Sequence, residues 1–147
     1  MVVGLNTSGL EEMKKILIAY DGSEDSKRAL DWAVELAKCT ESSITILTVV
    51  PSAMRMFAFA DIVTPGTFKS QALNMVQEAA KRIQGIPVTC ILREGDIADE
   101  ILRTSEDLGC DLIVMGRRGL GKIDRFLLGS VAEKVVKHSS KTVLMVR

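Results

Sequence analysis

Glycines and a hydroxyl gather after an apolar segment near the end of the chain, in a spacing suited to phosphate binding. Gly116 and Gly119 follow the apolar run 110–115, and nine residues separate Gly119 from the pair Gly129 and Ser130. A helix that begins at such a pair offers backbone N–H groups and a positive dipole end to an anion, and glycine lets the backbone approach without a Cβ in the way. Taken alone, glycines after a strand are equally well explained as turn residues.

The elements that must position these residues alternate along the chain between strand-like and helix-like segments. Short apolar runs of the strand type lie at 15–20, 43–50, 87–93, 110–115 and 142–146. Apolar residues at helical spacing predict helices after Ser23 as N-cap, over about 68–83, after Asp96 as N-cap with Gly109 at the C-terminal end, and over 130–137. Helices between consecutive strands require parallel crossovers. We therefore predict an α/β fold, a single-domain open doubly wound five-stranded parallel sheet of strand order 3-2-1-4-5 with helices on both faces.

Such a sheet also predicts where a ligand binds. The binding crevice lies beyond the carboxyl ends of the strands, where the strand order reverses, and the natural reversal here is between the first strand and the fourth. Asp21 follows the first strand, and Gly116 ends the fourth. Two features that are distant in sequence therefore converge on one crevice, which favours a nucleotide site there.

Composition narrows the functional classes. The 147 residues suit one domain, and 19 basic residues balance 19 acidic ones. Because the chain as a whole carries no excess of either charge, it has no bias toward nucleic acid or an acidic membrane. We expect neither as a partner.

Cysteines and loop composition predict a cytoplasmic protein. Cys39, Cys90 and Cys110 are far apart and lack CxxC spacing, which favours a reducing compartment and places all three in or near the core. Residues 1–9 carry no basic residue and no apolar run of signal-peptide length, and we interpret 1–12 as an N-terminal extension of the domain 13–147. The apolar loop 51–67 contains charged residues and prolines, which excludes a membrane span.

Several of these motifs together resemble a known family. The Asp-Gly-Ser at 21–23 after an apolar strand, the Gly95-Asp96 pair before a helix, the segment 111–116 and the pattern G-x2-G-x9-G-S are similar to those of universal stress proteins of the ATP-binding type. The resemblance covers nearly all of 13–147 and implies a fold of the adenine nucleotide alpha hydrolase type. Members of that family that lack the glycine pattern do not bind ATP, so its presence here bears on function.

The resemblance implies ATP as the ligand and assigns roles to particular positions. Backbone near Ala19 and Val49 would contact adenine, and Asp21 would lie close to the ribose and phosphates. The remaining implied positions wrap the ribose or hold phosphate oxygens: Gly116, Gly119, Gly129, Ser130 and Val131. We include Ser23, Met115, Arg117 and Arg118 as neighbouring candidate nucleotide-binding residues.

The chemistry of these side chains agrees with the implied roles. Ser130 has a hydroxyl that can donate to a phosphate, and the Asp21 carboxylate can accept from ribose hydroxyls or hold Mg²⁺ or Mn²⁺ beside the phosphates. The alternatives are that Asp21 only begins a helix, that Ser130 is an ordinary cap residue, and that Arg117 and Arg118 belong to a solvated basic face.

The same glycine loop comes close to a Walker A motif. Residues 116–122 read G-x4-G-K, but Ile123 follows where a serine or threonine would bind magnesium. The loop also follows the fourth strand and not an early one, so we do not predict a P-loop ATPase.

Residues for catalysis are scarce. His138, the only histidine, lies near the end of the last predicted helix, where a cation complements the helix dipole, and no Ser-His-Asp trio can be assembled around it. We therefore predict a non-catalytic, ATP-binding universal stress protein that acts as a nucleotide-dependent switch in the stress response. The alternative is a slow metal-dependent ATPase or nucleotidyl-transfer enzyme, with Asp21 holding the metal.

Two segments are candidates for protein contacts. The loop 51–70, in which Met54, Met56, Phe57 and Phe59 are crowded together, is either a partner surface or a flap on its own domain. The run 142–146 is apolar at nearly every position and ends the chain, so it would be a liability as an unpaired edge strand. We predict a homodimer joined through this strand, and the family resemblance points the same way.

Overall fold

The computed structural model describes residues 9, 12–52, 65–120 and 128–147. The strands are β1 (Lys15–Ala19), β2 (Ser43–Pro51), β3 (Val88–Gly95), β4 (Leu112–Gly116) and β5 (Thr142–Val146). The helices of the described residues are α2 (Glu24–Thr40), α4 (Pro65–Lys81), α5 (Ile97–Asp107) and α6 (Ser130–His138). The predicted extension 1–12 lies outside the described residues apart from positions 9 and 12.

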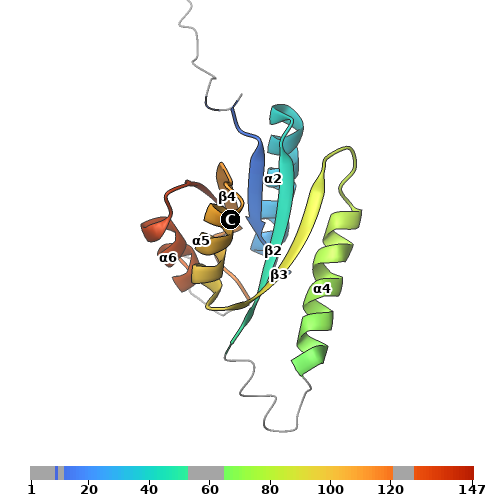
Figure 1. The fold of residues 1–147 in the computed structure, drawn as a ribbon, viewed down its shortest axis with the longest axis vertical. Helices are drawn as coiled ribbons and strands as arrows, with labels where there is room; N and C mark the ends of the chain where they lie inside the picture. The colour runs from blue at the N-terminus through green and yellow to red at the C-terminus, as the bar shows by residue number, and fades with distance from the viewer. Residues whose placement is uncertain (1–8, 10–11, 53–64, 121–127) are drawn as a thin grey trace, which may run out of the picture.

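The five strands form one parallel sheet in the order β3-β2-β1-β4-β5 (Figure 1). Strand β1 is central, and its last residue, Ala19, pairs with Leu47 of β2 on one side and Met115 of β4 on the other. The sheet therefore grows in opposite directions from β1, and the strand order reverses between β1 and β4. This confirms the predicted fold and strand order.

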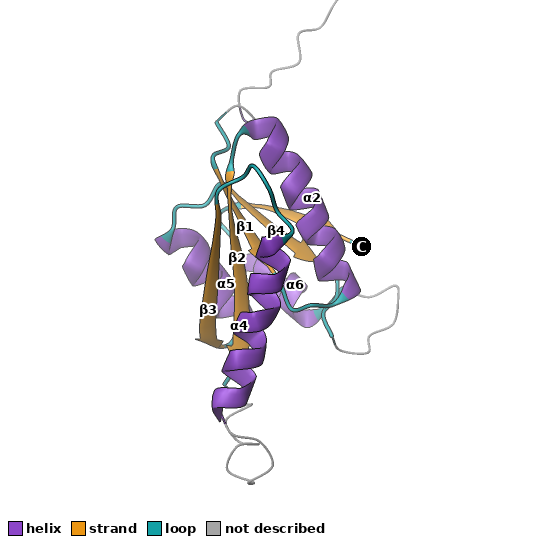
Figure 2. Ribbon diagram, turned by 90° about the vertical axis from the view of Figure 1, so that its right-hand side faces the viewer, coloured by secondary structure: helices purple, strands orange, loops and turns teal. Residues whose placement is uncertain are grey.

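Helices cover both faces of the sheet. Successive residues of a strand point to opposite faces, so both faces carry apolar side chains that the helices bury. Helices α2 and α4 pack on the face that carries Ile16, Ile18 and Val114, whereas α5 and α6 pack on the face that carries Leu17 and Ile113. Figure 2 shows the sheet between α2 and α4 on one side and α5 on the other. Each fully buried aliphatic side chain contributes about 1.5–3 kcal/mol before conformational entropy is counted.

The predicted helix ends are present. Ser23 caps α2, with its hydroxyl oxygen accepting from the Ser26 N–H at 3.2 Å, and Asp96 caps α5 by accepting from the Asp99 N–H at 3.0 Å. Gly109 follows α5 at a φ of 59°, the left-handed conformation that glycine adopts at lowest cost. Its N–H donates to the Glu106 carbonyl at 3.0 Å, which satisfies a carbonyl of the last helical turn.

Some boundaries differ from the sequence prediction. Helix α4 begins at Pro65, three residues before the predicted start, because the first helical position needs no N–H and suits the fixed φ of proline. Strand β2 continues through Pro51, which pairs with Gly95 at the end of β3. In the described part of the chain, no helix is long and apolar enough to span a membrane.

The cysteine prediction is correct for two thiols and wrong for the third. Cys110 is buried and Cys90 is half-buried, and burial raises the pKa of both thiols. Cys39 is exposed. On α2 the buried positions include Ala33 and Ala37, and Cys39 lies two residues beyond Ala37, which turns it about 200° around the helix and away from the sheet.

Candidate functional site

The carboxyl end of the sheet brings Asp21 and Gly119 together. Asp21 follows β1, and its Oδ1 accepts a hydrogen bond from the Ser23 N–H at 2.9 Å. Its Oδ2 lies 2.7 Å from the point where a Cβ on Gly119 would stand, so the second carboxylate oxygen faces the glycine. The two segments that the sequence placed at one crevice therefore meet there, and a side chain at position 119 would displace the carboxylate from this position.

Gly116 has a different environment. A Cβ at this position would lie 2.8 Å from the Asp25 Cβ and 2.9 Å from the Asp25 carbonyl carbon. The missing side chain therefore lets the first turn of α2 pack directly on the end of β4. This close contact holds α2 and β4 together at the crevice, beside the segment that leads to Gly119.

The second half of the glycine pattern returns to the end of β4. The Gly129 N–H donates to the Arg117 carbonyl at 3.1 Å, and the Arg117 N–H donates to the Val146 carbonyl at 2.7 Å. Gly129 is the N-cap of α6 and, having no side chain, makes no side-chain capping hydrogen bond to the first turn. Ser130, the first residue of α6, is exposed, and Val131 is partly buried. Anions bind at helix N-termini of this kind.

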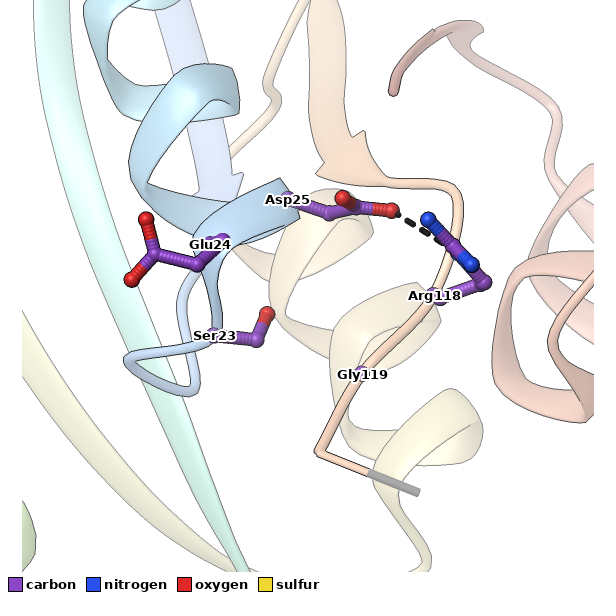
Figure 3. A pocket seen from close by; sticks show the side chains of 5 residues that line it. All are labelled: Ser23, Glu24, Asp25, Arg118 and Gly119. Atoms are coloured by element: carbon purple, nitrogen blue, oxygen red, sulfur yellow. Dashed lines mark hydrogen bonds and ion pairs between the residues drawn. The ribbon is translucent and has the colours of Figure 1, made fainter. Parts of the chain in front are cut away.

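A small pocket lies between the start of α2 and the segment after β4. It is lined by Ser23, Glu24, Asp25, Arg118 and Gly119 and has a volume of about 170 Å³ (Figure 3). Ligand pockets usually measure about 300–1,000 Å³, so this one accounts for only part of a nucleotide site. In Figure 3 the side chains of Asp25 and Arg118 point toward each other, whereas Glu24 points away.

Two lining residues, Glu24 and Asp25, were not among the predicted site residues. Both read from the sequence as acids that favour the N-terminal turn of a helix. In the structure Glu24 is exposed, but Asp25 is only 5% exposed and pairs with Arg28 and Arg118. Helical phase is the signal that could have found Asp25, because it lies four residues before the buried Ala29 and eight before Ala33, on the face of α2 that packs on the sheet.

Val49 and Ala19, the two positions expected to contact adenine, direct their backbone N–H and C=O groups to different sides of their strands. In β2 the backbone of Ser43 faces β1 and that of Ile44 faces β3, so the alternation turns Val49 toward the β1 side. Pairing with β1 stops at Leu47, so the described strands leave that side of Val49 open. The backbone of Ala19 faces β4, by the same alternation from Lys15, and is paired there with Met115.

Met115 contributes its side chain to the core. It is 4% exposed and packs with Leu17, Leu47 and Ile113 on the face covered by α5 and α6. Arg117 is partly buried. Lys122 and Ile123, at the near-match to a Walker A motif, lie outside the described residues.

Helix α6 is tied to the start of α5 by Lys134. Its Nζ lies 3.1 Å from an oxygen of Asp96 and 2.8 Å from an oxygen of Asp99. The hydrogen bond from the Asp99 N–H, together with Lys134, lowers the pKa of the Asp96 carboxyl, and the two carboxylates raise the pKa of Lys134. This contact joins the amino end of α5 to the middle of α6.

Metal ligands are sparse around the crevice. Across the residues with described positions, no group of three or more His, Cys, Asp or Glu side chains could hold a metal ion. Asp21 supplies one carboxylate, and its Oδ2 faces the position of Gly119. That fits Mg²⁺, which proteins often hold by one or two carboxylates together with phosphate oxygens of a substrate and water.

Comparison with known proteins agrees with this architecture. The sequence profile of the universal stress protein family matches residues 12–147. Universal stress protein YxiE of Bacillus subtilis is 35% identical over 145 residues, covering 90% of this chain and 98% of its own.

Solved structures agree as well. The structure of hypothetical protein MJ0577 superimposes with a TM-score of 0.80 at 30% identity, covering 90% of this chain and 94% of its own. A universal stress protein in complex with cAMP superimposes with a TM-score of 0.69 at 25% identity, covering 92% of this chain and 97% of its own. With the family profile matched over almost its whole length, the chain belongs to the universal stress protein family.

Proposed function

We propose that this protein binds ATP in the crevice between β1 and β4 and acts as a nucleotide-dependent switch in the stress response. The observation that carries the proposal is the meeting of Asp21 with Gly119 beside the uncapped N-terminus of α6. The relative in complex with cAMP, which has the same fold, supports an adenine nucleotide as the ligand.

The phosphates would bind at the start of α6. Gly129 leaves the first N–H groups of this helix without a capping side chain, and the exposed Ser130 adds a hydroxyl donor next to them. Arg118 supplies a cation from the neighbouring segment after β4. This set of donors has the charge and geometry for a phosphate chain.

The ribose and a divalent ion would be held around Asp21. Its Oδ2 faces the space at Gly119, where it can accept from ribose hydroxyls. The same oxygen can be a ligand of Mg²⁺ or Mn²⁺, with phosphate oxygens completing the coordination. Both roles need the space that a side chain at position 119 would fill.

Adenine would be read by backbone groups. The N–H and carbonyl of Val49 point to the side of β2 that β1 no longer covers, so this edge can pair with the edge of a base. Ala19 lies at the end of β1 and would form the neighbouring wall through its side chain, because its backbone pairs with Met115.

The protein contacts follow from the two predicted segments. We propose a homodimer joined through the edge of β5, and a partner surface on the predicted loop 51–70, whose ends the structure assigns to β2 (Pro51) and to α4 (from Pro65), and whose shape depends on the bound nucleotide. Positions 53–64 of that loop lie outside the described residues. Limited proteolysis with and without ATP tests the loop, and an unchanged cleavage pattern within it would remove it as the reporter of the bound state.

The first experiment is to denature freshly purified protein and identify the released small molecule by mass spectrometry. We expect ATP from the wild type and loss of ATP from the Gly129→Ala and Ser130→Ala variants. Ser43→Ala is the matched control, because Ser43 begins β2 at the opposite end of the sheet and should leave the bound nucleotide unchanged. An empty wild type that also fails to bind added ATP would overturn the proposal.

The same preparation separates a switch from an enzyme. Incubation with ATP and Mg²⁺ or Mn²⁺ should leave the ATP intact if the protein is a switch. ADP or AMP that accumulates, at a rate abolished by Asp21→Ala, would support a slow metal-dependent ATPase or nucleotidyl-transfer enzyme instead. We also propose that the protein is located in the cytoplasm.

A further inference from the structure

Asp25 is a buried carboxylate in the first turn of α2. It is 5% exposed, and its Cβ and carbonyl carbon lie against Gly116 at the end of β4. A buried carboxylate needs partners to offset its desolvation. Both of its oxygens have one, since Oδ1 accepts from Arg28 and Oδ2 accepts from the Arg118 Nε at 3.3 Å.

The two arginines are not equivalent. Arg28 comes from the same helix, three residues on, and its side chain is 48% exposed outside the pocket. Arg118 comes from the segment after β4, lines the pocket and is 28% exposed. Two guanidinium groups on one carboxylate leave one positive charge in excess. Because Arg118 is held through Nε, its two terminal amino groups are not used by this contact.

Arg118 also lies close to the amino end of α6. The carbonyl of the preceding residue, Arg117, accepts the hydrogen bond from the Gly129 N-cap. The Arg118 side chain thus lies against the first turn of α2, and its backbone follows the residue bonded to the N-cap of α6; both helix dipoles favour an anion in this region.

We propose that Asp25 is a positioning residue that orients Arg118 toward the outer phosphates of the bound nucleotide, and that this pair sets the preference for ATP over adenosine. The inference rests on the proposed function and deepens it. An arginine that is already anchored loses less side-chain freedom when it binds a phosphate, and its planar fork is presented in a fixed direction.

The test is a comparison of dissociation constants for ATP and for adenosine, measured by calorimetry on the full chain. Charged hydrogen bonds to phosphate predict that Arg118→Gln weakens ATP binding about tenfold or more and leaves adenosine binding unchanged. Asp25→Asn keeps the shape of the side chain. Like Arg118→Gln, it should raise the ratio of the ATP to the adenosine dissociation constant, by about threefold or more. A merely structural role of Asp25 would weaken both ligands equally.

The double variant and a matched control complete the design. In the Arg118→Gln background, Asp25→Asn should change the ratio no further, because Asp25 acts through Arg118. Arg28→Gln removes the other partner of the same carboxylate and should leave the ratio unchanged. Thermal unfolding monitored by circular dichroism verifies that each variant is folded. If Asp25→Asn does not fold, the ratio of the ATP to the adenosine dissociation constant in Arg118→Gln tests the inference.

The remaining outcomes distinguish a failure of this inference from a failure of the proposed function. An unchanged or lower ratio of the ATP to the adenosine dissociation constant in folded Asp25→Asn, or an unchanged ratio in Arg118→Gln, would overturn the inference while ATP binding by the wild type still supports the proposed function. A wild type that binds neither ligand would instead overturn the proposed function, and the inference with it.

Discussion

The carbonyl of Arg117 accepts a hydrogen bond of 3.1 Å from the N–H of Gly129. This contact joins the residue after β4 to the N-cap of α6 and closes the glycine pattern into a loop whose two ends lie side by side. The Arg117 N–H is held in turn by the Val146 carbonyl at the end of β5. The start of α6 is thus fixed to the carboxyl ends of two neighbouring strands, which is where a phosphate must be held relative to Asp21.

Gly116→Ala should destabilise the fold. The new Cβ would lie 2.8 Å from the Asp25 Cβ and 2.9 Å from its carbonyl carbon, so α2 must move away from β4. Overpacking of this kind costs about 1–3 kcal/mol of unfolding free energy. Urea unfolding measures it, with Gly66→Ala in α4 as the control because no atom of the described residues lies within 4 Å of its added Cβ. Equal stability of the two variants would contradict the packing role.

Gly119→Ala should leave stability nearly unchanged and weaken nucleotide binding. Among the described residues its Cβ would clash only with the Asp21 Oδ2, at 2.7 Å, and that end of a side chain can rotate away. We expect a change in unfolding free energy within about 0.5–1 kcal/mol, as for most surface substitutions. Displacing the carboxylate should cost about one hydrogen bond to a charged group, or roughly tenfold in ATP affinity. Calorimetry with ATP tests this. An ATP affinity equal to that of the wild type would mean that Asp21 does not contact the ligand.

Asp96→Ala should lower stability in a pH-dependent way. The Asp99 N–H and Lys134 hold the pKa of Asp96 below its ordinary value of 3.8, so the carboxylate stabilises the fold above that pH. This contribution is lost as the pH falls through the lowered pKa. Loss of the N-cap should cost about 1 kcal/mol near neutral pH.

The stability gap between wild type and Asp96→Ala should therefore narrow below about pH 4, as the carboxylate of the wild type is protonated. Urea unfolding at several pH values measures the gap. Lys134→Ala is the companion variant, because it removes exposed ion pairs and should change the stability little. A gap that widens in acid would mean that Asp96 does not stabilise the fold as a carboxylate.

Met145→Pro should dissociate the proposed homodimer without unfolding the domain. The backbone of Val146 faces β4, since its carbonyl accepts from Arg117, so the alternation turns the N–H of Met145 to the open edge of β5. Proline there removes an outward donor and is tolerated on edge strands. Met145→Ala keeps that N–H and should remain dimeric. Light scattering distinguishes the two variants, and a dimer that survives Met145→Pro would place the interface elsewhere.

The order of elements was predictable because it depends on local patterns. Strands of apolar residues and helices with one apolar face have periods that can be read directly, and parallel crossovers leave few ways to connect them. The caps at Ser23, Asp96 and Gly109 were predictable for the same reason, since capping involves residues only a few positions apart. Strand order and the crevice at its reversal then followed from general rules of such sheets.

Only the tertiary structure decided what each crevice residue contacts. Gly116 and Gly119 belong to one sequence pattern, yet one makes room for α2 and the other for the Asp21 carboxylate. Asp25 reads as an ordinary acid of a first helical turn, and its burial results from the packing of α2 on β4 and from the approach of Arg118. The open edge at Val49 likewise depends on β1 ending before β2. Sequence determines the periodicity of each element, whereas these contacts join segments up to 98 positions apart, and they exist only once the helices have packed on the sheet.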